Sequence, residues 1–489
     1  MRYDACIIGA GAEGLAAAAM LAGRGLKIVV VERDARAGGR CATREFHPGF
    51  RASPFVDELA AIPADIFWSL DLARRGVLLA PASTSLALWP DRTSLSLPWA
   101  NESPMAARAG SLRDAIRARV TADAARPPRR TLFAAREPHT PWPGEELAAG
   151  TLADLVDESQ AGSADNDHRM ASLLAGQTCD PFVAGSALHL LAGRPGGMPA
   201  GGLGRLGDAL RAAAEDAGAE IRCGLEAADI RRKGGRAAGV GLADGSEVSA
   251  RAVISTLDLK RTFLSLFSWS DLPRAVVDRL GAFRPAPGTA RLLLALDAPP
   301  APPAGSDAAV LRGPIHVAPD ALGESYRAWR RGAVPEHPPM QLRLVSAVDP
   351  SLAPDGGACM TVTLGAIPHT PFDGAWTHEK RDRLRDGVFT TLDSVLPGMT
   401  KHVTAAELIV PPDMEHRLGA TSGDLVGGEI AADQMLGFRP FADCAGTRTP
   451  VDGLYLAGGS SALGPLMTCA SGVAAAGALM ADFAAGKFR

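Results

Sequence analysis

The chain has 489 residues, of which 47% are hydrophobic, 21% charged and only 5% aromatic. An apolar fraction of this size can bury a core, which excludes an intrinsically disordered chain. Its 50 basic and 54 acidic residues leave a net charge of −4, without the basic surplus typical of nucleic-acid-binding proteins. Seven scattered cysteines without a CxxC pair predict neither a disulfide scaffold nor a redox-active cysteine pair, and we expect no metal site.

The first 32 residues have the pattern of a dinucleotide-binding unit. Residues 3–8 and 27–31 predict two buried strands, and residues 14–24 predict the helix between them. The run Gly9-Ala10-Gly11-Ala12-Glu13-Gly14 follows the first strand and is a GxGxxG fingerprint. Gly9 allows a tight turn, Gly11 lets the backbone approach a pyrophosphate, and Gly14 lets the helix pack closely on the sheet. The second strand ends at Glu32, where a carboxylate can accept hydrogen bonds from both ribose hydroxyls.

The residues after Glu32 favour FAD over NAD as the cofactor. Arg33 is followed by Gly38-Gly39-Arg40, which extends the predicted site past the ribose, as a long flavin dinucleotide requires. Arg40 is placed to neutralise pyrophosphate charge, and the two glycines leave room for the chain to pass over the cofactor. Glu13 is an unusual residue inside the fingerprint, and we expect it to order the loop rather than to do chemistry.

Two segments carry a resemblance to a known family. ERDARAGGRCAT (32–43) resembles the second flavin motif of the amine-oxidase-like flavoproteins, and EFHPGFRASPF (45–55) resembles their phytoene-desaturase-related branch. The chain is similar to bacterial relatives of the group named pyridine nucleotide-disulfide oxidoreductase domain-containing protein 2. The resemblance implies an α/β fold, with a Rossmann-type FAD-binding domain formed by residues 1–60, 200–265 and 424–489. Residues 61–199 and 266–423 would form an interleaved α+β substrate domain with a mixed sheet and a helical insertion.

The resemblance also assigns cofactor contacts beyond the N-terminus. It places the backbone of Ala227, in EAADI (226–230), against the adenine ring. Near the C-terminus, a short strand at 454–457 precedes two glycines and a helix that begins near residue 468. The helix N-terminus would face the flavin ring, where its dipole would stabilise the negative charge gained on reduction. Residues implied to line the flavin ring are Gly458, Gly459, Leu466, Met467 and Thr468.

The sequence departs from this family next to the flavin motif. Related members carry His-Pro followed by three glycines, where this chain has Ala462-Leu463-Gly464-Pro465-Leu466. Pro465 and Leu466 would narrow the space in which a long flat polyene could lie. The departure argues against a carotenoid substrate and leaves flavin binding intact.

The middle of the chain is less informative. Residues 152–160 and 168–176 predict helices, and the glycine-rich run 201–206 opens another helix without a preceding strand, so we reject a second dinucleotide site. The Arg-rich stretch 113–130 predicts a solvated helix face, with peripheral membrane contact as the alternative. The longest apolar runs are too short to span a bilayer. We expect a cytoplasmic monomer or homodimer.

Neither a catalytic base nor a substrate channel can be assigned from the sequence. His47 is the best-placed candidate for a base, although a lone histidine more often has a structural role. His416, Asp424 and Glu429 have weaker claims. The apolar segments 62–70 and 86–89 either wall a hydrophobic channel or, more commonly, form ordinary core.

Three functions stay open at this point. The first is an FAD-dependent oxidoreductase that transfers a hydride between an apolar, isoprenoid-like substrate C–H and flavin N5, as a C–C desaturase, saturase or isomerase. The second is a flavin oxidase of a C–N or C–O bond in a small metabolite. It is disfavoured by the small number of tyrosines, three, and because Lys260 matches a structural segment of the family. The third is a non-catalytic prenyl or protein binder resembling the GDP-dissociation inhibitors.

Overall fold

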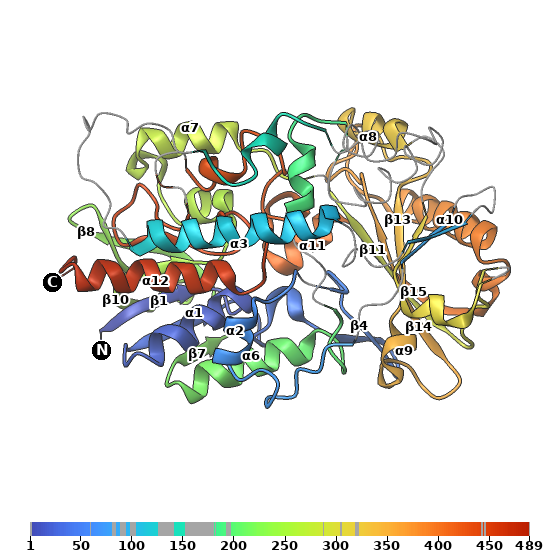
Figure 1. The fold of residues 1–489 in the computed structure, drawn as a ribbon, viewed down its shortest axis with the longest axis horizontal. Helices are drawn as coiled ribbons and strands as arrows, with labels where there is room; N and C mark the ends of the chain where they lie inside the picture. The colour runs from blue at the N-terminus through green and yellow to red at the C-terminus, as the bar shows by residue number, and fades with distance from the viewer. Residues whose placement is uncertain are drawn as a thin grey trace.

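The computed structural model describes residues 2–58, 60–80, 85–88, 94–97, 104–125, 141–151, 180, 182–191, 197–286, 288–303, 306–317, 322–441, 444 and 446–488. It contains two large β-sheets side by side, each with helices packed against it, and both chain ends lie at the side away from the second sheet (Figure 1). The helices predicted at 152–160 and 168–176 lie outside the described residues, as do residues 89 and 126–130.

The first sheet has the parallel arrangement of a dinucleotide-binding fold. Its strand order is β7-β2-β1-β10, β16 pairs with β10 on the far side from β2, and the hairpin β8–β9 pairs antiparallel with the beginning of β10. These strands are β1 (Tyr3–Ile8), β2 (Ile28–Glu32), β7 (Glu220–Cys223), β8 (Ala227–Lys233), β9 (Arg236–Leu242), β10 (Glu247–Ser255) and β16 (Leu454–Leu456).

Strand β1 shows why this sheet is buried on both faces. Ala5 and Ile7 point into the core beneath the helices, whereas Cys6 and Ile8 point into a second core that contains Phe263. A parallel strand covered on both sides reads as a continuous apolar run rather than an alternating one. The helices on the first face are α1 (Ala12–Ala22), α6 (Gly204–Asp216) and α12 (Ala470–Ala484), with α3 (Pro104–Ala125) alongside α12 (Figure 1).

The second sheet is mixed and comes from other parts of the chain. Its order is β15-β11-β14-β13-β12-β5-β6, in which only β12 and β5 pair in parallel. Helix α10 packs on one face, and the small hairpin β3–β4 packs on the other through Phe50. The strands are β3 (Arg44–His47), β4 (Phe50–Ala52), β5 (Ser85–Leu88), β6 (Ser94–Leu97), β11 (Ala290–Leu296), β12 (Ile315–Val317), β13 (Met340–Leu344), β14 (Ala358–Leu364) and β15 (Val403–Ile409). The remaining α-helices are α2 (Ala64–Ser69), α7 (Arg274–Ala282), α8 (Leu322–Arg330), α9 (Val345–Val348), α10 (His378–Val395) and α11 (Pro411–Leu418).

The parallel sheet and the mixed sheet agree with the predicted α/β class. Strand β13 ends at Leu344, where the chain leaves the sheet and forms two short helical turns. Asp349 accepts a hydrogen bond from the backbone N–H of Ser351 and caps the second turn, and Pro350 has no N–H for a sheet ladder.

Three arginines of α3 have contacts within the protein. Arg113 is buried, Arg117 forms two hydrogen bonds with Asp65, and the Arg119 guanidinium lies 4.4 Å from the ring centre of Trp142. None of the helices in the described part of the chain combines the length and apolar character that crossing a bilayer requires.

Candidate functional site

A cleft lies at the carboxyl edge of the first sheet. It is lined by Gly9, Glu32, Thr256 and Gly458, which end or follow β1, β2, β10 and β16. Ligands of open α/β sheets bind at this edge, where the strand order changes direction. The cleft has a volume of about 440 Å³, within the roughly 300–1,000 Å³ typical of ligand pockets.

The fingerprint glycines have different surroundings. A Cβ on Gly9, whose φ is +97°, would collide with Thr256 Oγ1, and a Cβ on Gly14 would collide with the carbonyl oxygen of Gly9. A Cβ on Gly11 would meet no protein atom within 4 Å. Gly9 and Gly14 therefore serve the turn and the helix packing, whereas Gly11 leaves open space in the cleft wall at the N-terminus of α1. This cradle fits a pyrophosphate, which binds to backbone N–H groups at such a helix end.

Glu32 is held at the end of the cleft beside the carboxyl end of β2. Its carboxylate accepts hydrogen bonds from the backbone N–H of Ala10 at 2.7 Å and of Asp34 at 2.9 Å. Burial raises the pKa of Glu32, and the two backbone N–H groups oppose that shift. Arg33 and Ala227, the first residue of β8, also line this end.

The Gly-Gly-Arg segment lies against the fingerprint. The N–H of Gly38 donates to the carbonyl of Ala10 at 2.8 Å, and a Cβ on Gly39 would lie 3.2 Å from Gly11 Cα. Arg40 lines the cleft and donates to the carbonyl of Leu425. Its guanidinium thus connects the N-terminal motif with the loop at 424–427.

The far end of the cleft is built by the C-terminal segment. Gly458, Gly459, Pro465 and Thr468 line it. A Cβ on Gly459 would collide with the carbonyl of Val426, so the two loops touch through their backbones. Thr468 donates its backbone N–H to the carbonyl of residue 61 at 3.3 Å, which ties this end to the chain that follows β4.

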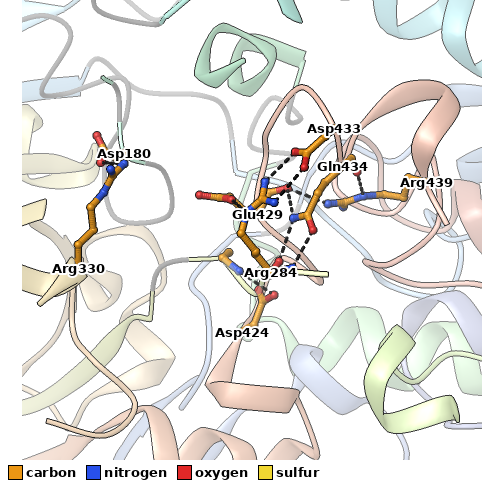
Figure 2. Close-up of polar contacts among 9 residues, drawn as sticks. Asp180, Arg284, Arg330, Asp424, Glu429, Asp433, Gln434 and Arg439 are labelled. Atoms are coloured by element: carbon orange, nitrogen blue, oxygen red, sulfur yellow. Dashed lines mark hydrogen bonds and ion pairs between the residues drawn. The ribbon is translucent and has the colours of Figure 1, made fainter. Parts of the chain in front are cut away.

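A polar network fixes the loop that covers this end (Figure 2). The Asp424 carboxylate accepts hydrogen bonds from the backbone N–H groups of residues 286 and 426–428. Arg284 pairs with Glu429 and Asp433, and buried Arg439 donates to the carbonyls of residues 429, 434 and 459. Asp424 and Glu429, weak candidates for chemistry, thus have structural partners. The ion pair between Asp180 and Arg330, at 2.5 Å, lies apart from this network.

A buried ion pair positions the chain beside the far end of the cleft. The Asp57 carboxylate accepts two hydrogen bonds from Arg291, at 2.8 and 2.6 Å, and one from Thr361 at 2.9 Å. Burial would raise the pKa of Asp57, but the Arg291 guanidinium holds that pKa below its usual value. The pair anchors residues 53–58 on the second sheet, so that Glu58, which pairs with buried Arg343, lines the cleft.

His189 was not predicted from the sequence and lines the same cleft. Burial lowers the pKa of this histidine to about 4, and its Nδ1 has no hydrogen-bond partner among the described residues. It lies in a short helical turn at 186–191 without any recognisable motif. Thr256 was also missed, although its place directly after a buried strand was a usable signal.

The predicted site residues fall into two groups. Those that line the cleft are Gly9, Gly11, Ala12, Glu13, Glu32, Arg33, Gly39, Arg40, Ala227, Gly458, Gly459 and Thr468. Those outside its lining are Ala10, Gly14, Gly38, Leu466 and Met467, of which the last two are buried in the core.

Of the remaining candidates, Glu429 and the two histidines lie outside the lining, whereas Asp424 is part of it. His47 belongs to β3, where its ring centre is 5.7 Å from that of Phe50, and His416 belongs to the last turn of α11. In the segments considered as channel walls, the buried side chains Ile66, Leu86 and Leu88 contribute to cores instead.

We expect the buried neutral histidines to make the protein less stable in acid. Burial lowers the pKa of His316, in β12, to about 4, against about 6.5 in an unfolded chain. Below about pH 6.5 this imidazole binds a proton in the unfolded state but stays neutral in the folded state. The free energy of unfolding therefore decreases as the pH falls. We expect His316→Gln to reduce the loss of unfolding free energy between pH 7 and pH 5 by about 2 kcal/mol. Urea unfolding of the wild type and the variant at the two pH values measures this difference. An equal loss of unfolding free energy in both proteins would contradict the prediction.

Comparisons with known proteins agree with this geometry. Residues 143–478 match the family described as flavin containing amine oxidoreductase, and residues 7–71 match an NAD(P)-binding Rossmann-like domain. Pyridine nucleotide-disulfide oxidoreductase domain-containing protein 2 of Mus musculus is 27% identical over 98% of this chain and 94% of its own length. Hydroxyneurosporene desaturase of Rhodobacter capsulatus is 27% identical over 98% of both chains.

Solved structures show the same fold. Cyclohexylamine oxidase from Brevibacterium oxydans has a TM-score of 0.59 at 16% identity, with both chains fully covered. An oxidoreductase from Methanosarcina mazei also has a TM-score of 0.59, at 17% identity, over 98% of this chain and 99% of its own. The matches confirm the resemblance carried by residues 32–43 and 45–55. With a glycine cradle that fits a pyrophosphate and a family match over more than half of its length, this chain is an FAD-dependent oxidoreductase and belongs to the flavin containing amine oxidoreductase family.

Proposed function

We propose that this enzyme transfers a hydride between a C–H bond of an apolar substrate and N5 of FAD, as a C–C desaturase, saturase or isomerase. The observation that carries the proposal is the apolar lining at the far end of the cleft. Its lining includes Val56, Ala60, Ile430 and Pro465, which offer an apolar surface to a substrate. FAD supplies the hydride chemistry, and the protein must hold the reacting carbon close to N5 and exclude water.

Two of the polar features in the cleft lining carry no net charge. Glu58 pairs with buried Arg343, and burial lowers the pKa of His189 to about 4, so this imidazole is neutral near pH 7. A balanced ion pair and a neutral ring do not select a charged substrate. The relatives that are desaturases by name and align over nearly the full length of this chain support the same reaction class.

Two features weigh against amine oxidation as the alternative. The described residues that line the cleft include neither a lysine nor a phenylalanine, tyrosine or tryptophan. Lys260 lies instead with its Nζ 6.0 Å from the ring centre of Phe283.

Pro465 lies in the cleft wall where relatives have glycine, which favours a substrate shorter than a long polyene.

Spectroscopy tests the proposal directly. We expect the purified protein to be yellow, with flavin bands at about 370 and 450 nm. Under anaerobic conditions, acyclic isoprenoids of increasing length should bleach the longer-wavelength band if the enzyme desaturates them, and matched primary amines should not. Bleaching by amines alone would support the oxidase instead. A protein that stays colourless after incubation with FAD would contradict flavin dependence and favour the non-catalytic binder.

A further inference from the structure

The side chain of Glu13 lies at the N-terminus of α12, at the opposite end of the sequence. Its Oε1 accepts a hydrogen bond from the N–H of Cys469 at 2.8 Å, and its Oε2 accepts one from the N–H of Gly472 at 2.8 Å. The hydroxyl of Ser471 donates to the same Oε2 at 2.7 Å. Glu13 is only 7% exposed. One buried carboxylate thus receives three donors from the first turn of a fifteen-residue helix.

The same contacts join three segments of the cleft wall. The Ser471 hydroxyl also accepts a hydrogen bond from the N–H of Gly458 at 2.8 Å, directly after β16. A Cβ on Gly472 would collide with the carbonyl oxygen of Glu13, so α12 crosses directly against the start of α1. Glu13 therefore connects three elements: α1, α12 and the turn that follows β16. Each of them either contributes residues to the cleft or lies beside it.

The hydrogen bonds around Glu13 suit a charged carboxylate, because two of its three partners are backbone N–H groups, which can only donate. Burial raises the pKa of Glu13, and these hydrogen bonds and the charge of Arg40 oppose that rise. A helix N-terminus carries roughly half a positive charge, which a carboxylate at that position offsets. The sequence-based expectation was that this positive end acts on the flavin ring. In the structure the carboxyl group of Glu13 already occupies this position.

We propose that Glu13 makes the bound FAD harder to reduce by neutralising the positive end of α12. Reduction by two electrons and one proton leaves the flavin ring with one additional negative charge, which an unneutralised helix N-terminus would stabilise. Glu13 removes that stabilisation from the wall formed by Gly459, Pro465 and Thr468. The inference rests on FAD binding in this cleft but not on the identity of the substrate.

Two measurements on the FAD-loaded enzyme test the proposal. The midpoint potential is measured during slow reduction with a reference dye. Sulfite is the second probe, because its lone pair forms a bond to N5 and leaves the ring with the same additional negative charge. We expect Glu13→Gln to shift the potential to a more positive value and to lower the Kd for sulfite by about tenfold. Neither measurement needs a substrate, so failure here is distinguishable from failure of the proposed reaction.

Two controls separate charge from structure. Glu247→Gln makes the same chemical change at the beginning of β10, which is the strand end away from the cleft. The Glu247 side chain is 56% exposed, and this variant should change neither the potential nor the sulfite affinity. Ser471→Ala removes one hydrogen bond to Glu13 and the link to Gly458 but keeps the charge, and should shift both values much less than Glu13→Gln.

Several outcomes would overturn the proposal. One is a Glu13→Gln enzyme that retains FAD with unchanged potential and sulfite affinity, and another is a Ser471→Ala enzyme that shifts as far as Glu13→Gln. If the glutamine variant does not retain FAD, the shorter Glu13→Asn replaces it under the same expectations. The wild type provides a test without any variant, because complete bleaching of its FAD by stoichiometric sulfite would show that a positive end acts on the ring.

Discussion

Replacing Gly11 by valine is expected to give a folded protein that no longer retains FAD. The backbone at Gly11 is extended, with φ −78° and ψ −178°, which suits a β-branched residue. An added Cβ would meet no protein atom within 4 Å, so the side chain would extend into the space assigned to the pyrophosphate. We expect FAD affinity to fall by up to about 100-fold, because overpacking of this size costs up to ~3 kcal/mol. The ratio of flavin to protein absorbance after gel filtration measures it.

Gly14→Ala is the matched control for that experiment. Its added Cβ would collide with the carbonyl oxygen of Gly9, so the expected effect is on folding, seen as a lower melting temperature. The Gly11→Val protein should melt close to the wild-type protein when both are stripped of FAD. A valine variant with normal flavin content would show that the cofactor does not pass this backbone.

Replacing Arg291 by methionine is expected to lower the free energy of unfolding by about 3–5 kcal/mol, because Asp57 is left charged and unpaired in the core. The Arg291 side chain is 0% exposed and that of Asp57 8%. Arg291 also donates to the carbonyl of Ser53 at 3.2 Å and to the Thr363 hydroxyl, so the effect extends to the chain that carries Glu58. Guanidinium unfolding, with the slope checked against the wild type, measures the change.

The double variant Asp57→Asn/Arg291→Met completes the test. It removes both charges, and neutral replacements of buried pairs are often tolerated much better than loss of one partner. We therefore expect it to be more stable than Arg291→Met alone. Additive losses from the two single substitutions would mean that the residues do not act as a pair.

The N-terminal half of the site could be predicted because its signals are local. A strand, a glycine turn, a helix and a strand ending in Glu32 occur within thirty residues, and each element is specified by its own residues. Helix α12 and strand β16 were also visible as short patterns. Their place at the cofactor came from the family resemblance, and the pairing of β16 with β10 was not predicted, since sequence periodicity does not say which strands pair.

The substrate end depends on contacts between distant residues. Glu58 reaches the cleft because Asp57 pairs with Arg291, a residue 234 positions away. The contacts of Glu13 with α12 span more than 450 positions, so the sequence indicated an ordering role without its partner. Leu466 and Met467 were carried over from relatives with a different loop, and here Pro465 lines the cleft while both of these side chains are buried.

The position of β16 and α12 has a consequence for biosynthesis. Both elements complete a cradle whose first half, the β1–α1 turn, leaves the ribosome more than 400 residues earlier. A nascent chain therefore holds an unfinished cradle, with its phosphate-binding turn formed and its opposite wall missing, until translation has passed residue 484. FAD supply then acts on the finished polypeptide, in which the first and last helices already pack directly against each other and are linked by Glu13.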